Sequence, residues 1–188
     1  MRIITGKAKG IRLNTLEGNT TRPTAERVKE AIFSMIQFDL EGRRVLDLFA
    51  GSGQLGLEAV SRGAASAILV DQSKQAVRII QENVEKTKLS SYCTVLQTEG
   101  LEFLRRCQGQ QFDIVFLDPP YASDLYTRAL RALLEWNLLK PQGMVVCESD
   151  FDELFQNDRE LANCFCVKKQ SRYSKTVITI LAQKEAEE

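Results

Sequence analysis

Apolar and polar positions change their period several times along the chain, and this pattern predicts alternating strands and helices. Short continuous apolar runs are expected to form buried strands, whereas apolar residues spaced three or four apart are expected to form one face of a helix. The predicted strands span 44–50, 66–71, 92–98, 112–117 and 143–149, and the predicted helices span 54–62, 73–88, 99–107 and 123–138. This alternation is typical of an α/β fold with a mostly parallel sheet and right-handed crossovers.

Both ends of the chain predict antiparallel strand pairs. Glycines separate the first pair, and a Ser-Arg-Tyr-Ser turn separates the second. The predicted pairs are 2–5 with 10–13, and 163–170 with 175–183. A helix from Thr24 to about Gln37 is expected to connect the first pair to the sheet. The 188 residues suffice for one domain, so we expect a single unit, 1–188, in which 1–22 form a small arm.

The tetrapeptide Asp118-Pro119-Pro120-Tyr121 directly follows the predicted strand 112–117. In open α/β sheets, ligands bind at the carboxyl ends of the strands. The prolines stiffen this corner, the Asp118 carboxylate and the Pro119 carbonyl offer two hydrogen-bond acceptors, and Tyr121 offers a ring on which a base can stack. Two acceptors can hold the hydrogens of an aromatic amino group so that its nitrogen lone pair faces an electrophile. We therefore predict that these four residues are catalytic, with a turn that only ends the strand as the alternative.

A glycine-rich turn follows the first predicted strand. Asp47 lies inside that strand, and the turn before the next predicted helix consists of Gly51, Ser52 and Gly53. Glycines let the backbone approach a ligand closely, and the start of a helix offers unpaired N–H groups. Asp71 ends the next apolar run, about twenty residues after the glycine turn, where a ribose-binding acid is expected. The pattern therefore predicts a nucleotide-like cofactor.

The glycine spacing also matches the dinucleotide-binding fingerprint G-x-G-x-x-G, so a nicotinamide-dependent oxidoreductase is an alternative interpretation. Asp47 argues against it, because a carboxylate at this place would repel a pyrophosphate. It would attract S-adenosylmethionine, which carries an ammonium and a sulfonium group. The chain also has no histidine for acid–base chemistry. Two structural alternatives stay open: Asp47 caps the glycine turn, or Asp71 is a helix N-terminal acid.

With these two motifs the chain resembles the class I S-adenosylmethionine-dependent methyltransferases. The stretch from Asp47 to Gly53 is similar to their first motif, and Asp118 to Tyr121 is similar to the motif of those that methylate amino groups. More narrowly, the chain resembles the RsmD family, which methylates a guanine N2 in bacterial small-subunit (16S) ribosomal RNA. The stretches that carry this narrower resemblance are 1–6, 10–13, 22–24, 27–33 and 172–176.

The resemblance implies a Rossmann-like fold with a mostly parallel seven-stranded sheet, an antiparallel C-terminal hairpin and a small N-terminal β-hairpin arm. It also implies S-adenosyl-L-methionine as the cofactor. The cofactor-binding residues that we predict are Asp47, Phe49, Gly51, Ser52, Gly53, Asp71, Gln72, Glu99, Gly100 and Leu101. Glu99 departs from the family pattern, since many relatives carry Asp or Asn near the adenine-binding turn.

The formal net charge is zero, with 25 basic and 25 acidic residues, but the charges are unevenly spread. Residues 1–13 contain four basic side chains and no acid. A basic edge near a base-binding pocket suits contacts with phosphate, although an ordinary solvated face is the alternative. The predicted substrate-binding residues are Arg2, Lys7, Lys9, Arg12, Arg22, Thr24 and Arg27. The resemblance implies ribosomal RNA, in a partly assembled 30S particle, as the partner.

Bulk properties fit a small cytoplasmic enzyme. Hydrophobic residues make up 44% of the chain, too many for disorder, and neither a leader nor an apolar run of membrane length is visible. The five cysteines form no C-x-x-C pair, and the lack of histidine excludes a His-containing zinc site. We expect a monomer without a metal. An adenine-N6 or protein-glutamine amino methyltransferase shares the tetrapeptide, so both stay open as alternatives.

Overall fold

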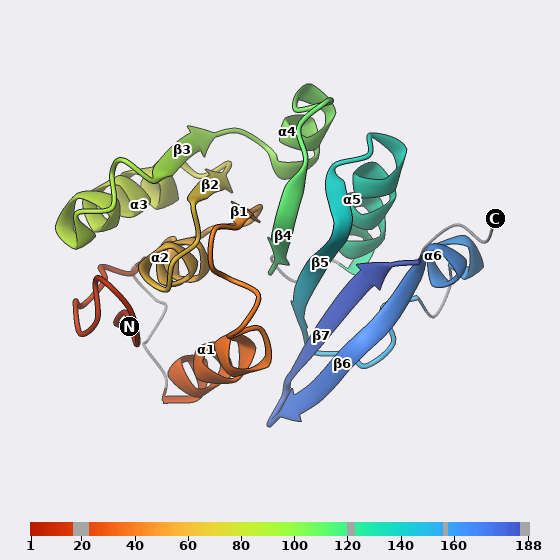
Figure 1. Cartoon of the computed structure of the whole chain (residues 1–188), viewed down its shortest axis with the longest axis horizontal. Helices are drawn as coiled ribbons and strands as arrows, with labels where there is room; N and C mark the ends of the chain where they lie inside the picture. The colour runs from red at the N-terminus through yellow and green to blue at the C-terminus, as the bar shows by residue number, and fades with distance from the viewer. Residues whose placement is uncertain (17–22, 120–122, 156–157, 185–188) are drawn as a thin grey trace.

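Seven strands form one sheet in a computed structural model of the protein, in the order β3-β2-β1-β4-β5-β7-β6 (Figure 1). The structure describes residues 1–16, 23–119, 123–155 and 158–184. The strands are β1 Arg44–Asp47, β2 Ser66–Asp71, β3 Cys93–Gln97, β4 Phe112–Leu117, β5 Leu139–Ser149, β6 Phe165–Tyr173 and β7 Thr176–Gln183. Strands β1 to β5 are mutually parallel, and the hairpin of β6 and β7 adds to β5 in antiparallel fashion. The predicted mostly parallel sheet with an antiparallel C-terminal hairpin is confirmed.

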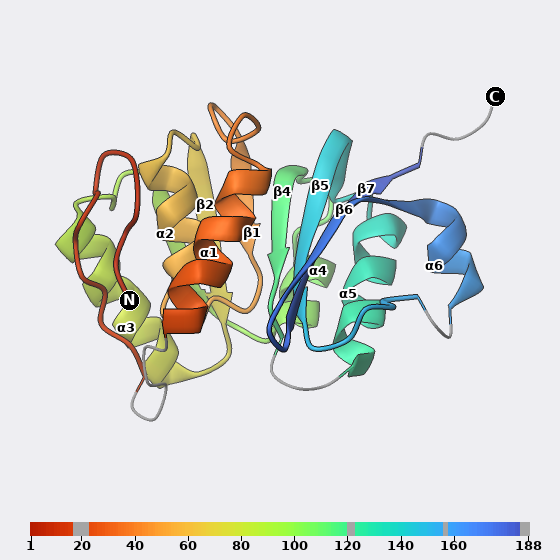
Figure 2. The ribbon, with the colours of Figure 1, turned by 90° about the horizontal axis from the view of Figure 1, so that it is seen from below.

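Helices cover both faces of this sheet (Figure 2). They are α1 Pro23–Met35, α2 Gln54–Ser61, α3 Lys74–Thr87, α4 Gly100–Arg106, α5 Ser123–Glu135 and α6 Arg159–Cys164. Apolar residues of α1, α2 and α3 join one hydrophobic core, and those of α4, α5 and α6 join the other. Within the described ranges, no helix has both the length and the apolar content that a membrane crossing needs. The arrangement is the Rossmann-like α/β fold that the sequence predicts.

Strand β4 is buried on both faces, which explains why its sequence is a continuous apolar run rather than an alternating one. Ile114 and Phe116 point into the core beneath α1 to α3, and Val115 and Leu117 point into the core beneath α4 to α6. The strand order reverses between β1 and β4, since the chain proceeds outward from β1 on one side and from β4 on the other. In open α/β sheets, the crevice at the carboxyl ends of two such strands is the place where ligands bind.

An acid at the start of β4 has hydrogen-bond donors and positive charges around its carboxylate. Asp113 is buried, and its carboxylate accepts hydrogen bonds from Arg43 Nη1 at 3.1 Å, Lys140 Nζ at 2.9 Å and the Arg44 backbone N–H at 2.8 Å. Although burial opposes it, these donors hold the pKa of Asp113 below its usual value. This pairing fixes the amino ends of β1, β4 and β5 relative to one another.

The N-terminal arm is less regular than predicted. Instead of strands at 2–5 and 10–13, the arm has one isolated antiparallel bridge, between Arg2 and Arg12. The two segments still pair with each other, since the Ile3 N–H donates to the Ile11 carbonyl at 2.9 Å and the Gly10 N–H donates to the Ile3 carbonyl at 2.8 Å. The arm also bonds to helix α2, because the Lys7 N–H donates to the Ser61 carbonyl at 2.8 Å. The antiparallel pairing of the predicted hairpin is therefore confirmed. Its two regular strands are not, because part of the arm's backbone bonds to the core of the protein.

Three predicted element boundaries are also corrected. The first strand ends at Asp47 rather than at residue 50, because the turn to α2 begins there. The predicted strand 163–170 begins inside α6, which Asp158 caps by accepting a hydrogen bond from the Leu161 N–H at 3.1 Å. Strand β5 begins at Leu139, four residues before its predicted start.

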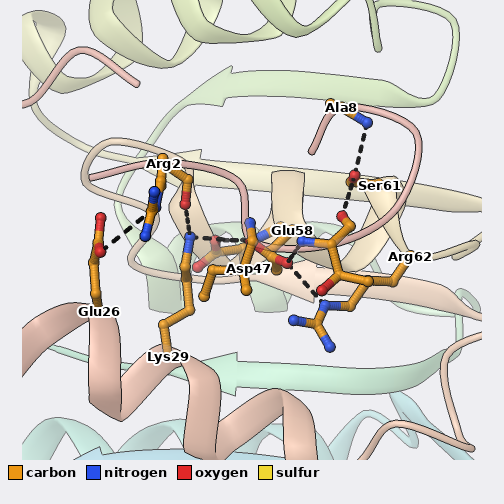
Figure 3. Close-up of polar contacts among 11 residues, drawn as sticks. Arg2, Ala8, Glu26, Lys29, Asp47, Glu58, Ser61 and Arg62 are labelled. Carbon is orange, nitrogen blue, oxygen red and sulfur yellow. Dashed lines mark hydrogen bonds and ion pairs between the residues drawn. The ribbon is translucent and has the colours of Figure 1, made fainter. Parts of the chain in front are cut away.

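A buried carboxylate holds the arm onto helices α1 and α2 (Figure 3). Glu58 in α2 is 0% exposed and accepts hydrogen bonds from the N–H groups of Ile4 at 2.8 Å and Thr5 at 3.0 Å. It also forms ion pairs with Lys29 Nζ at 3.0 Å and Arg62 Nε at 2.8 Å. Burial lowers the pKa of Lys29, while the neighbouring Glu58 opposes that shift. One side chain thus joins the arm, α1 and α2.

Replacing this carboxylate is expected to destabilise the whole protein. Glu58→Ala leaves the Lys29 ammonium buried without a counter-charge and two arm N–H groups without an acceptor. We expect the free energy of unfolding, measured by denaturant titration, to fall by about 3–5 kcal/mol. The control is Glu102→Ala, which removes only exposed pairs with Arg105 and Arg106 and should cost less than about 1 kcal/mol. Equal losses in the two variants would contradict the anchoring role.

Candidate active site

Four neighbouring parallel strands present a carboxyl group at the same edge of the sheet. Asp71 is the last residue of β2, Asp47 is the last of β1, Asp118 directly follows β4, and Glu148 is the next-to-last of β5. These strands are adjacent in the order β2-β1-β4-β5. The sequence predicted a role for the first three acids and missed Glu148. The sequence pattern that could have identified Glu148 is the one that identified Asp47, a single acid after a run of apolar strand residues.

The glycine turn after β1 takes up a conformation that requires glycine. Gly51 and Gly53 have φ angles of 56° and 77°, in the left-handed region. Asp47 is 2% exposed, and its Oδ2 accepts a hydrogen bond from the Gly56 N–H, in the first turn of α2, at 2.9 Å. The carboxylate therefore caps α2, as one of the two interpretations of the sequence predicted.

The charge on Asp47 is only partly compensated. Burial raises the pKa of Asp47 to about 7, and the negative charges of Asp118 and Asp71 act in the same direction, while the hydrogen bond from Gly56 opposes them. A positively charged group bound at this edge would relieve that unfavourable burial.

Asp71 connects two turns. Its Oδ2 accepts a hydrogen bond from the Gly51 N–H at 2.9 Å, and its Oδ1 accepts one from the Ser73 N–H at 2.8 Å. Ser73 in turn caps α3 by accepting a hydrogen bond from the Ala76 N–H. Each carboxylate oxygen can accept more than one hydrogen bond, so Asp71 keeps acceptor capacity for a ligand.

The third turn, after β3, packs against the first. A Cβ atom on Gly100 would lie 3.0 Å from Cε1 of Phe49, so a larger residue would displace the Phe49 ring. Glu99 caps α4, because its Oε2 accepts a hydrogen bond from the Glu102 N–H at 2.8 Å. Gln72 is exposed and Leu101 is half-buried. The structure thus places the predicted cofactor-binding residues at the ends of β1, β2 and β3 and in the turns that follow them.

Asn83 joins the glycine turn to the N-terminal arm. This fully buried side chain of α3 donates from Nδ2 to the carbonyls of Ser52 and Asn14, both at 2.9 Å, and accepts at Oδ1 from the Asn14 N–H at 2.7 Å. The sequence analysis did not single it out. The sequence pattern that could have identified Asn83 is a polar residue on the apolar face of a helix, next to Ile80 and Val84.

A buried acceptor at the start of α2 has no partner. Gln54 directly follows the glycine turn, and its Oε1 atom is buried without a hydrogen bond to any part of the chain that the structure describes. Buried polar atoms are almost always paired, so this oxygen can accept a hydrogen bond from a ligand or an ordered water. Elsewhere in the described residues, no group of three or more His, Cys, Asp or Glu side chains lies close enough to hold a metal.

Asp118 and Glu148 form the second half of the site. Part of the Asp118 residue is exposed to solvent. The protein atoms around its carboxyl group displace water from it, and this desolvation raises the pKa of Asp118 to about 6. Burial, together with the charge of Asp118, raises the pKa of Glu148 to about 8. Pro119 is buried. The predicted catalytic residues Pro120 and Tyr121 lie outside the described residues.

Five of the predicted substrate-binding residues lie on the surface: Arg2, Lys7, Lys9, Arg12 and Arg27. The ammonium of Lys7 lies 4.9 Å from the ring centroid of Tyr92, and Arg2 Nε lies 3.7 Å from Glu26 Oε2. Arg22 and the side chain of Thr24 are not among the described parts of the structure. The arm thus presents exposed positive charge, and the Glu58 network fixes it to helices α1 and α2.

Comparison with known proteins gives consistent matches along the chain. Residues 1–182 match the family described as Conserved hypothetical protein 95. Ribosomal RNA small subunit methyltransferase D of Haemophilus influenzae is 37% identical over 81% of this chain and 80% of its own, and the Escherichia coli protein of that name is 32% identical over 81% and 76%.

Solved structures agree with these matches. A candidate methyltransferase from Escherichia coli superposes with a TM-score of 0.85 at 27% identity and covers 100% of this chain and 99% of its own. A conserved hypothetical protein from Streptococcus pyogenes reaches a TM-score of 0.74 at 41% identity over 83% and 95% of the two chains.

Removing the Asp47 charge is expected to stabilise the cofactor-free protein at high pH. The unfolded carboxyl ionises near pH 4 and the folded one near pH 7, so wild-type stability falls as pH rises between these values. Asp47→Asn should remove the part of this loss that Asp47 causes, a gain of up to about 4 kcal/mol above pH 7 relative to pH 4. Asp118 and Glu148, whose pKa values are also raised, keep their own parts of the loss. Denaturant unfolding across this range measures the difference.

The exposed Asp124, replaced by Asn, is the control and should leave the pH profile unchanged. If the Asp47→Asn and wild-type profiles run parallel, the buried carboxyl does not titrate as described.

Proposed function

The chain belongs to the family of Conserved hypothetical protein 95, the RsmD family, and we propose that it is an S-adenosylmethionine-dependent methyltransferase that modifies N2 of a guanine in small-subunit (16S) ribosomal RNA. The relatives from Haemophilus influenzae and Escherichia coli carry the name ribosomal RNA small subunit methyltransferase D. One observation carries the assignment. The Asp118-Pro119 corner follows β4 and the glycine turn follows β1, the two adjacent strands between which the strand order reverses. An amino group and a methyl donor can therefore meet there.

The turns after β1 and β2 suit this cofactor. The left-handed Gly51 and Gly53 let the backbone approach a ligand, and the unpaired Oε1 of Gln54 can accept a hydrogen bond from its ammonium group. Asp47 gains a positive partner that offsets its burial. When bound, the cofactor supplies the methyl group as part of a sulfonium cation.

The remaining predicted cofactor contacts follow from the same geometry. Asp71 binds the two ribose hydroxyls with the acceptor capacity that its bonds to Gly51 and Ser73 leave. Gln72 and Leu101 line the adenine, and Phe49, packed on Gly100, closes the space between the first and third turns. Glu99 caps α4 through one oxygen and keeps acceptor capacity at the other, so its contact with the adenine stays a prediction.

The chemistry at the amino group is mainly one of orientation. The Asp118 carboxylate and the Pro119 carbonyl accept the two hydrogens of the amino group, so its lone pair faces the methyl donor. Burial of Pro119 holds its carbonyl in place. The proton leaves after methylation, to Asp118 or to water. The stacking of the base on Tyr121 stays a prediction, and no metal takes part.

The arm provides the electrostatic part of RNA binding. Exposed basic residues such as Lys7, Lys9 and Arg12 contact phosphates, so binding weakens as salt rises. The target guanine leaves its stack to reach the Asp118 corner. We further propose that the enzyme acts as a cytoplasmic monomer, in a single catalytic unit, on a partly assembled 30S particle.

The product distinguishes this function from its alternatives. The purified protein is incubated with tritiated S-adenosylmethionine and with 30S particles or free 16S RNA from a strain that lacks the enzyme. We expect label in N2-methylguanosine at one position. Label in N6-methyladenosine or in glutamine would replace the proposal with one of the other amino methylations, and binding of NAD without S-adenosylhomocysteine would favour an oxidoreductase.

Loss of the Asp118 carboxylate is expected to separate chemistry from cofactor binding. In Asp118→Ala, single turnover should slow by several orders of magnitude, because the amino group loses one of its acceptors. Affinity for S-adenosylhomocysteine, measured by calorimetry, should change little.

Asp71→Ala serves as the opposite control. It should weaken S-adenosylhomocysteine binding by roughly tenfold or more, since two hydrogen bonds to ribose are lost. Loss of both turnover and affinity in Asp118→Ala would mean that Asp118 supports the fold, and unchanged affinity in Asp71→Ala would remove its ribose role.

A further inference from the structure

Glu148 lies beside the catalytic corner, and the mechanism above does not use it. Strand β5 pairs in parallel with β4, with Leu117 opposite Cys147. The next positions along the two strands are Asp118 and Glu148. Since neighbouring positions across a parallel sheet point to the same side, the two carboxyl groups lie side by side. The raised pKa of Glu148 has the charge of Asp118 among its causes, as such proximity requires.

The pattern of the core tells which way this pair faces. Leu117 and Cys147 point into the core beneath α4 to α6. Phe116 and Val146, one position earlier on each strand, point to the opposite face, into the core beneath α1 to α3. Asp118 and Glu148 follow this alternation, and Ile178, which pairs with Glu148, belongs to the same core. Both carboxyl groups thus share the side of the sheet on which the glycine turn leads into α2.

No structural bond accounts for the Glu148 carboxylate. Among the described residues, nothing donates a hydrogen bond to it and no basic nitrogen pairs with it, so that burial and Asp118 together raise its pKa. The hydroxyl of Tyr126 donates to the backbone carbonyl of Glu148 and fixes the strand end, not the side chain. Asp113, at the other end of β4, has three donors. A half-buried carboxylate of this kind gains most from a donor that a ligand brings.

Resting on the proposed function, we infer that Glu148 accepts a hydrogen bond from N1–H of the target guanine and thereby determines the choice of base. Guanine presents N1–H and the N2 amino group side by side, so two adjacent carboxyl groups can accept from both. A bound sulfonium cation lowers the raised pKa of Glu148, so that its carboxyl group is ionised when the base binds. Adenine presents a lone pair at N1, which this carboxylate repels. Asp118 and Pro119 bind an amino group of either base, whereas Glu148 rejects the base that lacks N1–H.

The test uses a base that differs from guanine at this edge. 16S RNA is assembled with 2-aminopurine in place of the mapped target guanine and reconstituted into 30S particles. This base keeps the N2 amino group but has no hydrogen on N1. For the wild type, we expect kcat/KM for guanine to exceed that for 2-aminopurine by roughly 10- to 100-fold. In Glu148→Ala, the ratio should fall to within about threefold. If turnover of the variant is too slow, competitive binding of the two particles gives the ratio.

The ratio compares two substrates with the same protein sample, so it does not depend on the fraction of folded protein. Calorimetry should show that Glu148→Ala binds S-adenosylhomocysteine, which lacks the sulfonium charge, as the wild type does. Glu148→Gln, whose amide oxygen can still accept from N1–H, should retain part of the preference. Asp150→Ala removes the same charge two residues later and should leave the ratio unchanged. If Glu148→Ala keeps the wild-type ratio of kcat/KM for guanine to that for 2-aminopurine, the inference about Glu148 is wrong, while the proposed function stands. Absence of guanine N2 methylation by the wild type would instead overturn the proposed function.

Discussion

The site depends on an imbalance of charge between the two ends of the sheet. At the amino end of β4, the buried Asp113 pairs with the partly exposed Arg43 and Lys140. At the carboxyl end, in the ranges that the structure describes, no lysine or arginine nitrogen pairs with the acids that follow four neighbouring strands. Those acids are Asp71, Asp47, Asp118 and Glu148. Because parallel strands all end at one edge, their carboxylates accumulate there, and a bound cation can satisfy them. A sulfonium cofactor provides that cation and the reactive methyl group together.

The buried Glu58 network gives this edge a fixed neighbour. It anchors the basic arm to α1 and α2, and Asn83 connects the end of the described arm to the glycine turn. Cofactor binding and the basic surface are therefore parts of one rigid unit. The phosphate contacts proposed for the arm would thereby be held at a fixed place relative to the glycine turn.

Much of this could be predicted from sequence, because the signals are local. Continuous apolar runs identified the parallel strands, and the acids and glycines at their ends followed from the same pattern. The failures are long-range. The arm pairs with itself as the predicted hairpin does, but the N–H groups of Ile4 and Thr5 bond to Glu58, more than fifty residues away, which the sequence did not predict. The role of Glu148 depends on the register between β4 and β5, which no single strand reveals. The unpaired atom of Gln54 is visible only once its neighbours are placed.

The most direct test of the central claim is the exchange of protons on cofactor binding. S-adenosylmethionine is titrated into the protein by calorimetry near pH 6.5, in buffers of different ionisation enthalpy. At this pH the α-amino group of the cofactor is already protonated. Because a bound cation lowers the raised pKa values of the carboxyl groups at this edge, we expect a net release of protons to the buffer. Binding without proton exchange, or with proton uptake, would contradict the account.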